Sequence, residues 1–189
     1  MAKIYVACLA SYNAGTLHGT WIDLEGKDSA DVGAEIAAML RTSPFPNVTV
    51  KCPETAEMVP SAEGWAIHDY ESPVRLGEYS GIEAALRAQA VEELQGEFGE
   101  DVVSAFLEFV DHDATAEDIR EAIEERYHGT YETKADFAAE LIEECGDLME
   151  VPDSLARYFD YESYARDLEL GGDFSFIHNS GGWHVISQH

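Results

Sequence analysis

The sequence predicts an α+β protein built from three small consecutive domains. Two observations support this fold class: hairpin patterns stand near both ends of the chain, and helical patterns fill most of the stretch between them. The chain has 189 residues, 46% of them hydrophobic, which is enough apolar material for packed cores. We place the three domains at residues 1–75, 76–114 and 115–189.

The first domain is predicted to be a β-β-α-β unit, in which an antiparallel sheet carries one helix. Residues 4–9 and 17–24 have strand composition and flank the turn-forming sequence SYNAGT, and residues 65–70 (WAIHDY) are a third predicted strand. Apolar residues at helical spacing predict a helix over residues 31–41. Residues 46–64 are expected to form a loop.

The second domain, residues 76–114, is predicted to be acidic and helical, with helices over residues 81–98 and 100–110. The third domain, residues 115–189, is predicted to combine helices with a C-terminal β-hairpin. Thr115 and Thr133 are each followed three residues later by Asp, the spacing of a capping box that opens a helix, and Gly146 would close the second of these helices. The other elements expected in this domain are short helices over residues 152–159 and 160–170, and hairpin strands over residues 174–178 and 183–187.

Negative charge is concentrated in the middle of the chain. The chain carries 38 acidic and 11 basic residues, a formal charge of -27, and residues 76–147 alone hold 21 acids and four bases. Such an excess favours a basic partner and argues against direct binding of nucleic acid. A solvated surface in a salt-adapted organism is the plain alternative, but that adaptation would spread acids over the whole surface. Because the same stretch keeps its apolar helical spacing, we interpret it as a folded anionic recognition surface.

In the helix expected after Thr115, carboxylates three or four residues apart line one face. They lie roughly 5–6 Å apart along the helix axis, whereas phosphates on one DNA strand advance by about 3.4 Å. Several acidic helices side by side therefore approach the charge density of DNA. Like charges at this spacing weaken an isolated helix, so helix stability does not explain the pattern. The acids predicted to form the recognition surface are Glu97, Glu100, Asp101, Glu108, Asp111, Asp113, Glu117, Asp118, Glu121, Glu124, Glu125, Glu132, Asp136, Glu140, Glu143, Glu144 and Asp147.

No motif predicts an enzyme, a cofactor or a metal site. The sequence has no GxGxxG, P-loop or GxSxG, and its seven histidines form no HxxxH or HExxH pair. Asp111, Asp113 and Thr115 match the start of a calcium loop, but Ala116 and Ala122 replace the Gly and Glu that such a loop needs. Catalysis would require an unrecognised site, so we expect a protein that is not an enzyme and holds no cofactor.

The remaining polar and aromatic side chains are expected to be structural. Cys8, Cys52 and Cys145 are too far apart for a disulfide framework or a CxxC zinc site, so we expect free thiols with buried side chains.

The N-terminal stretch lacks the core of a signal peptide, and no apolar run approaches membrane-spanning length, which predicts a cytoplasmic protein. The aromatic residues expected mainly in the core are Tyr12, Trp21, Trp65, Tyr70 and Trp183.

The sequence resembles the ArdA antirestriction family in four stretches: IYVACLASYNAGTLHGTWIDL, EGWAIHDYE, LGEYSGIEAALRAQAVEEL and FDYESYARDLEL. The similarity extends over nearly the full length, and the acidic middle agrees with it. The resemblance implies an elongated, three-domain homodimer that mimics bent B-form DNA and occupies the DNA-binding groove of type I restriction-modification enzymes. It also implies a non-enzymatic inhibitor carried by mobile genetic elements, in which carboxylates stand in for phosphates.

A second kind of interaction protein stays open as an alternative: an acidic adaptor or chaperone for another basic nucleic-acid-binding protein. Both hypotheses predict binding that weakens with salt. Only a DNA mimic is expected to compete with duplex DNA for a restriction enzyme.

Overall fold

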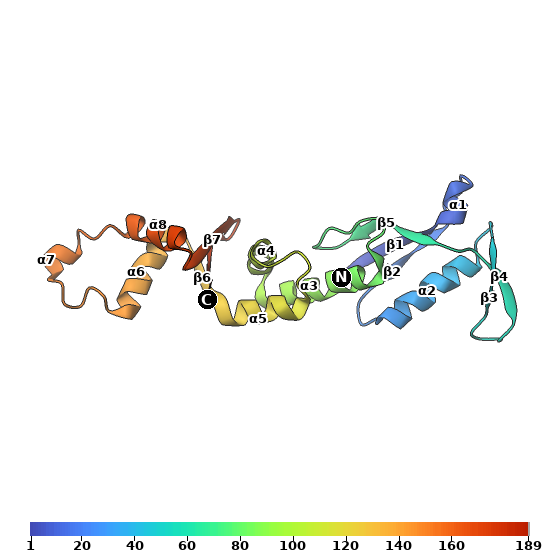
Figure 1. Cartoon of the computed structure of the whole chain (residues 1–189), viewed down its shortest axis with the longest axis horizontal. Helices are drawn as coiled ribbons and strands as arrows, with labels where there is room; N and C mark the ends of the chain where they lie inside the picture. Colours follow the sequence, from blue (N-terminus) through green and yellow to red (C-terminus); the bar gives the residue numbers. More distant parts are fainter. Residues whose placement is uncertain (189) are drawn as a thin grey trace. The chain divides into compact units, whose positions relative to one another are not determined.

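The structure, a computed structural model, describes residues 1–188 and divides into two compact units, Met1–Glu93 and Leu94–His189 (Figure 1). Helices and three small antiparallel sheets make up these residues, which confirms the predicted α+β class. The predicted domain boundaries after residues 75 and 114 stay a prediction, because a division into two units does not test them. Each unit is described separately below.

The first unit is built on a three-stranded antiparallel sheet in the order β2-β1-β5. The three predicted strands are confirmed, and so is the helix expected over residues 31–41. The turn expected between the first two strands contains a five-residue helix, α1, whose N-cap is the Cys8 thiol. The elements in chain order are β1 (Lys3–Cys8), α1 (Leu9–Asn13), β2 (Gly19–Asp23), α2 (Ser29–Arg41), β3 (Val48–Lys51), β4 (Met58–Ser61), β5 (Trp65–Glu71) and α3 (Gly81–Phe98), whose last residues belong to the second unit.

The loop expected over residues 46–64 was wrong in part, because it contains the antiparallel pair β3 and β4. Each strand is only four residues long, and Pro60 lies within β4 opposite Thr49. A period-2 pattern is hard to recognise over four residues, and proline normally argues against a strand unless the strand lies at an edge. In a two-stranded sheet both strands are edges, so this proline is tolerated.

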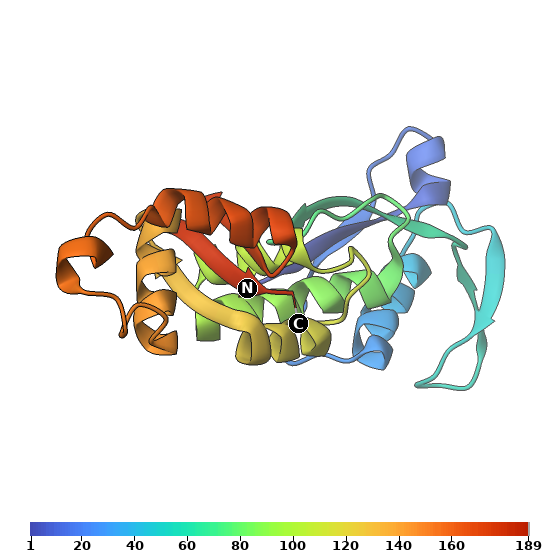
Figure 2. The same cartoon turned by 60° about the vertical axis from the view of Figure 1, so that its left-hand side comes forward.

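The core of the first unit lies between one face of its sheet and the helices α2 and α3 (Figures 1 and 2). Ile4, Val6 and Ile22 point into this core from β1 and β2, and they are fully buried. They meet the apolar side of α2, including Val32 and Ile36. Burial of this apolar area is the main stabilising term for the unit.

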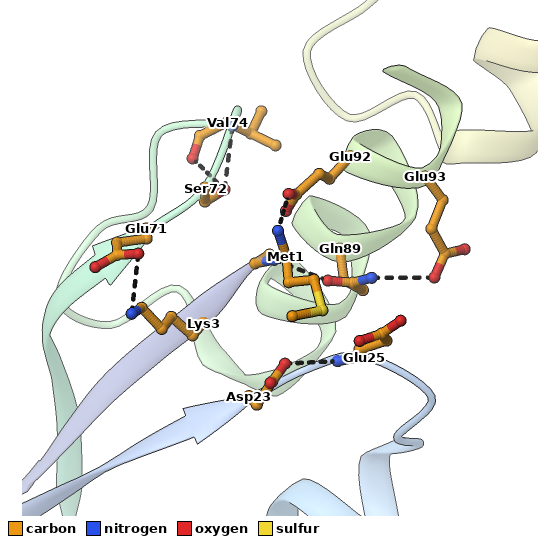
Figure 3. A network of polar contacts seen from close by, with 11 residues as sticks. Met1, Lys3, Asp23, Glu25, Glu71, Ser72, Val74, Gln89, Glu92 and Glu93 are labelled. Carbon is orange, nitrogen blue, oxygen red and sulfur yellow. Dashed lines mark hydrogen bonds and ion pairs between the residues drawn. The ribbon is translucent and has the colours of Figure 1, made fainter. Parts of the chain in front are cut away.

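A polar network fixes the start of β1 to helix α3 (Figure 3). The backbone N–H of Ala2 donates to Gln89 Oε1 at 3.0 Å, and Gln89 Nε2 donates to Glu93 Oε1 at 3.1 Å. The α-amino group of Met1 donates to Glu92, and this hydrogen bond raises the pKa of the amino group. Because Gln89 is buried, its two hydrogen bonds satisfy groups that would otherwise be costly to leave unpaired.

The second unit is built on another three-stranded antiparallel sheet, in the order β6-β8-β7. The predicted hairpin is confirmed as β7 and β8, and the predicted helices are present. The strand β6 was missed: its register with β8 shifts between Tyr127 and Gly129, and this bulge interrupts the alternation that would mark a strand. The remaining elements in chain order are α4 (Glu100–Phe109), α5 (Ala116–Arg126), β6 (Tyr127–Tyr131), α6 (Lys134–Cys145), α7 (Asp153–Ala156), α8 (Tyr161–Gly171), β7 (Phe174–Asn179) and β8 (Gly182–Ser187).

Aromatic and branched side chains form the core of the second unit. Phe106 of α4 is fully buried and meets the ring of Tyr127 edge-on, with centroids 5.8 Å apart. Phe137 of α6 lies edge-on to Phe174 and Phe176 of β7 at 4.9 and 5.7 Å. These contacts position α4 and α6 on the sheet and so orient the acidic side chains that the two helices carry.

The three cysteines are free thiols, as expected, but only Cys8 is buried. Cys52 is half-buried and donates to Glu54. Cys145 is exposed at the end of α6, so the expectation of a buried side chain was wrong there. The residue lies on the outer side of the last helical turn, just before the left-handed cap at Gly146.

Candidate acidic interaction surface

All seventeen acids predicted to form a recognition surface lie in the second unit, and together we call them the acidic surface. Sixteen of them are exposed and Asp101 is half-buried. They are carried by the end of α3, by α4, α5 and α6, and by the connections that follow α4, β6 and α6. The second unit holds 24 acids and five bases, against 14 acids and six bases in the first.

Helix α5 shows why acids on these helices face outward. Its Ile119 and Ile123 are buried, and their four-residue spacing sets one face against the core. Glu117, Glu121 and Glu124 therefore lie on the remaining face, and all are exposed. The amphipathic spacing of the sequence thus sorts the carboxylates to solvent.

Two acids of the surface also start the helices that carry it. Asp118 accepts hydrogen bonds from the backbone N–H and the hydroxyl of Thr115 at 2.8 and 2.7 Å, and the Asp118 N–H donates back to Thr115 Oγ1. Asp136 makes the same capping box with Thr133 at the start of α6. The hydroxyl hydrogen bond holds the pKa of Asp118 below its usual value. Both predicted capping boxes are confirmed.

The few cations of this region are turned toward the protein itself. Arg120 of α5 donates to Glu97 Oε1 at 2.7 Å, and its guanidinium lies over the Phe98 ring, 5.6 Å from the centroid. The same hydrogen bond raises the pKa of Arg120 and lowers that of Glu97. Glu117 lies farther from the guanidinium, at 4.0 Å. The Glu97 carboxylate is thereby neutralised by Arg120, whereas the carboxylates of α5 remain exposed to solvent.

Arg126 and Lys134 follow the same arrangement. The Arg126 guanidinium lies 6.0 Å from the centroid of the Phe109 ring. Lys134 Nζ pairs with Glu169 and stands 4.4 Å from the Trp183 ring centroid. These half-buried cations are thus engaged by aromatic rings and by Glu169, and Arg126 also borders a depression lined by acids of the surface.

Asp101 differs from the other sixteen acids because it ties α4 to the β7–β8 turn. Ser180 Oγ donates to Asp101 Oδ1 at 2.6 Å, and Asn179 Nδ2 donates to the Asp101 carbonyl at 2.7 Å. Its carboxylate therefore has a positioning role within the unit. Sequence inspection could not separate it from its neighbours, since the partner residues lie nearly eighty positions later.

The buried His184 extends this network into the sheet. The Oδ1 of Asn179 faces both the Gly181 N–H and His184 Nε2, at 3.0 and 2.8 Å, so Nε2 carries the proton. In the neutral imidazole Nδ1 then accepts from Tyr127 Oη at 2.9 Å. Burial lowers the pKa of His184, which favours this neutral form. The network joins β6, β7 and β8 to the start of α4.

One further acid, Glu140, is engaged by an aromatic hydroxyl. Tyr131 Oη donates to Glu140 Oε1 at 3.2 Å. Burial of the phenol, and secondarily the negative charge of Glu140, raises the pKa of Tyr131 to about 12. Tyr131 therefore stays a neutral donor over the whole physiological range.

No group of three or more His, Cys, Asp or Glu side chains among residues 1–188 is arranged to hold a metal ion. Asp111, Asp113 and Asp118 do line a shallow depression at the α4–α5 connection together with Arg126. Over the same residues no helix combines the length and the apolar content that a membrane span needs.

The inward placement of Arg120, Arg126 and Lys134 is the feature of this surface that inspection of the sequence missed. The sequence contains only part of the information needed to predict this placement. Each of these residues lies on a predicted helix, but tertiary packing decides which aromatic ring it contacts. The net charge alone does not tell whether acids and bases alternate on the surface or are separated.

The sequence model of a family described as Antirestriction protein (ArdA) matches residues 4–181. A search of curated proteins gave no match.

Proposed function

This chain belongs to the ArdA family of antirestriction proteins, and we propose that it acts as a DNA mimic that occupies the DNA-binding groove of type I restriction-modification enzymes. The observation that carries the proposal is the acidic surface: sixteen exposed carboxylates on one compact unit, with the neighbouring cations Arg120, Arg126 and Lys134 half-buried against Glu97, Phe109 and Glu169.

The physical argument is substitution of carboxylates for phosphates. A groove that binds DNA carries Lys and Arg side chains spaced to neutralise phosphates, and DNA binding gains free energy when counterions are released. Exposed carboxylates on α4, α5 and α6 offer the same groove an alternative set of anions without a nucleotide to cleave. Electrostatic attraction over this unit also speeds the encounter with a basic surface.

Inhibition by occupancy needs no chemistry from the inhibitor, so we propose that the protein has no catalytic activity of its own. We further propose that it works as a symmetric homodimer in the cytoplasm, because one chain is short for imitating a long DNA site. A gene for such an inhibitor suits a mobile genetic element, whose unmodified DNA is exposed to restriction on entry. Sedimentation tests the assembly: a protein that stays monomeric at micromolar concentration while inhibiting fully contradicts the dimer.

The experiment that tests the function is a cleavage assay with a purified type I enzyme and unmodified DNA. Inhibition is expected to be competitive, so that raising the concentration of the unmodified substrate DNA restores cleavage. Inhibition that excess substrate DNA leaves unchanged would contradict occupancy of the groove. Absence of inhibition, together with tight binding to a different basic nucleic-acid-binding protein, would instead support an acidic adaptor or chaperone.

A further inference from the structure

The sheet of the first unit has a second face that no helix of residues 1–93 covers along most of its length (Figures 1 and 2). Lys3, Tyr5 and Trp21 lie on this face, opposite to the core residues Ile4 and Ile22. We call it the open face. Trp21 was expected in the core, and this was wrong: 43% of the residue is exposed. Alternation in a strand gives two faces, and only the packing of α2 and α3 decides which one is buried.

The strand register arranges the open face as two rows of three side chains. One row has Lys3 between Asp23 on β2 and Glu71 on β5. The next row has Tyr5 between Trp21 on β2 and Asp69 on β5. Directly paired residues share a face, with strands about 4.8 Å apart and rows roughly 6.6 Å apart. Two aromatic rings are thus bordered by three exposed carboxylates.

The aromatic pair is held in position by the backbone beneath it. The rings of Tyr5 and Trp21 are 5.5 Å apart between centroids, at a tilt of 56°. A Cβ at Gly19 would lie 2.8 Å from Cζ of Tyr5 and 2.3 Å from the carbonyl of Val6, so only glycine lets the tyrosine ring lie over this position. Ala7, the residue paired with Gly19, is fully buried, so the open region ends there.

A cation of the protein already uses this aromatic surface. Lys3 Nζ stands 5.2 Å from the centroid of the Trp21 ring and pairs with Glu71 at 3.0 Å (Figure 3). Asp23 lies on the neighbouring strand in the same view. The Trp21 ring therefore lies in a negative field and accepts a positive charge over its π system.

We propose that the open face binds an arginine side chain from a basic segment of the partner protein. The guanidinium stacks on the Trp21 and Tyr5 rings, and Asp23 or Asp69 accepts its N–H groups. Charge complementarity favours this occupant, because the two rows carry three carboxylates and only one lysine and so have a net negative charge.

Arginine fits this face better than lysine for a physical reason. Its guanidinium is planar and weakly hydrated, so it stacks on a ring while its edge still donates to a carboxylate. An ammonium group is more strongly hydrated and offers no flat surface. The bound arginine would compete with Lys3 for Trp21, which makes Lys3 an internal competitor.

The test measures binding of a fluorescently labelled octa-arginine peptide, and of octa-lysine, by anisotropy at several salt concentrations. Octa-arginine is expected to bind more tightly than octa-lysine. Trp21→Ala is expected to weaken octa-arginine binding about 2- to 5-fold, the range for an exposed cation–π contact. Its salt slope should stay that of the wild type, because no charge is removed. Tyr79→Ala, at a side chain that is more exposed and lies off the face, is the matched control and should change nothing.

Lys3→Gln provides an arm that keeps Trp21 intact. Removing the internal competitor is expected to strengthen octa-arginine binding more than Lys51→Gln does, although both remove one positive charge from the same unit. Equal affinities of wild type and Trp21→Ala, together with equal effects of the two lysine variants, would overturn the proposal. A change of sedimentation in Trp21→Ala with unchanged peptide affinity would also overturn it, because the face would then serve a second copy of the chain.

The inference deepens the proposed function by adding a second contact to the same partner, and the two can fail separately. If the wild type inhibits a type I enzyme and Trp21→Ala inhibits equally well, the open face has no part in binding while the DNA mimic stands. If the wild type inhibits no such enzyme but binds octa-arginine through Trp21, the open face stands and the mimic fails.

Discussion

Replacing Glu117, Glu121, Glu124 and Glu125 with glutamine removes four charges from one exposed helix face and leaves its fold contacts in place. None of the four belongs to the Thr115 capping box, and Arg120 keeps its 2.7 Å hydrogen bond to Glu97 when Glu117 is changed. Among the ion pairs of the described residues, the variant loses only the 4.0 Å contact between Glu117 and Arg120.

The expected loss of binding follows from the contacts that the four carboxylates would make. An exposed ion pair contributes about 0.2–1 kcal/mol, so four of them contribute about 0.8–4 kcal/mol, which corresponds to roughly 4-fold to 900-fold in affinity. The fold should be unharmed or slightly steadier, because like charges three or four residues apart cost about 0.2–0.5 kcal/mol per pair in a helix.

The assay measures displacement of labelled duplex DNA from a type I enzyme, across a range of salt concentrations. The variant should bind more weakly, and its affinity should depend less on salt because fewer ion pairs form. The matched control changes Glu25, Glu57, Glu63 and Glu83, four exposed acids of the first unit, to glutamine. Equal loss of affinity and equal salt slopes in both variants would refute the reasoning, since total charge would then explain binding without a special role for α5.

Three further predictions concern stability. Burial lowers the pKa of His184 below its ordinary value of 6.5, so the unfolded chain takes up this proton first as pH falls; the contribution of His184 to the free energy of unfolding should be fully present above about pH 6.5 and decline below it. In urea titrations between pH 7 and 5, His184→Gln should make the free energy of unfolding decline less steeply than in the wild type. His112→Gln, at an exposed histidine, is the control. A decline as steep in His184→Gln as in the wild type would contradict the prediction. Thr133→Ala removes the N-cap of α6 and should lower the unfolding free energy by about 1 kcal/mol, whereas Thr16→Ala, at an exposed threonine outside the helices and strands, is the control; no change on urea unfolding would exclude a stabilising cap. Gly182→Ala should cost about 1–3 kcal/mol, because its φ is +126° and a Cβ would lie 2.8 Å from the Tyr131 carbonyl; an unchanged thermal midpoint would show that β8 can shift.

Local signals allowed much of the fold to be predicted from the sequence. The capping boxes at Thr115 and Thr133 depend on residues three positions apart, and the left-handed cap at Gly146 depends on one glycine, so both could be read directly. The long helices likewise follow from the spacing of apolar residues. These features need no knowledge of the tertiary structure.

Features that depend on distant partners could not be predicted in the same way. Strand β6 is recognisable only through its pairing with β8, more than fifty residues later. The exposure of Trp21 depends on which face of the sheet α2 and α3 cover. The acids of the candidate surface could be named from charge density, but the positioning role of Asp101 and the inward turn of Arg120 depend on contacts across the fold.

The order of strands in the second unit has a consequence for synthesis of the chain. β8 lies between β6 and β7 but follows both in the sequence, so neither of the earlier strands has its sheet partner until residues 182–187 have been made. His184, which joins the three strands to α4, arrives with the same segment. The acidic helices therefore emerge from the ribosome before the sheet that orders them, and their mutual repulsion should keep the unfinished unit from associating with other nascent chains. Purified chains truncated before residue 182 are accordingly expected to be cut by protease throughout the second unit, whereas chains that include residues 182–187 gain protection in a single step.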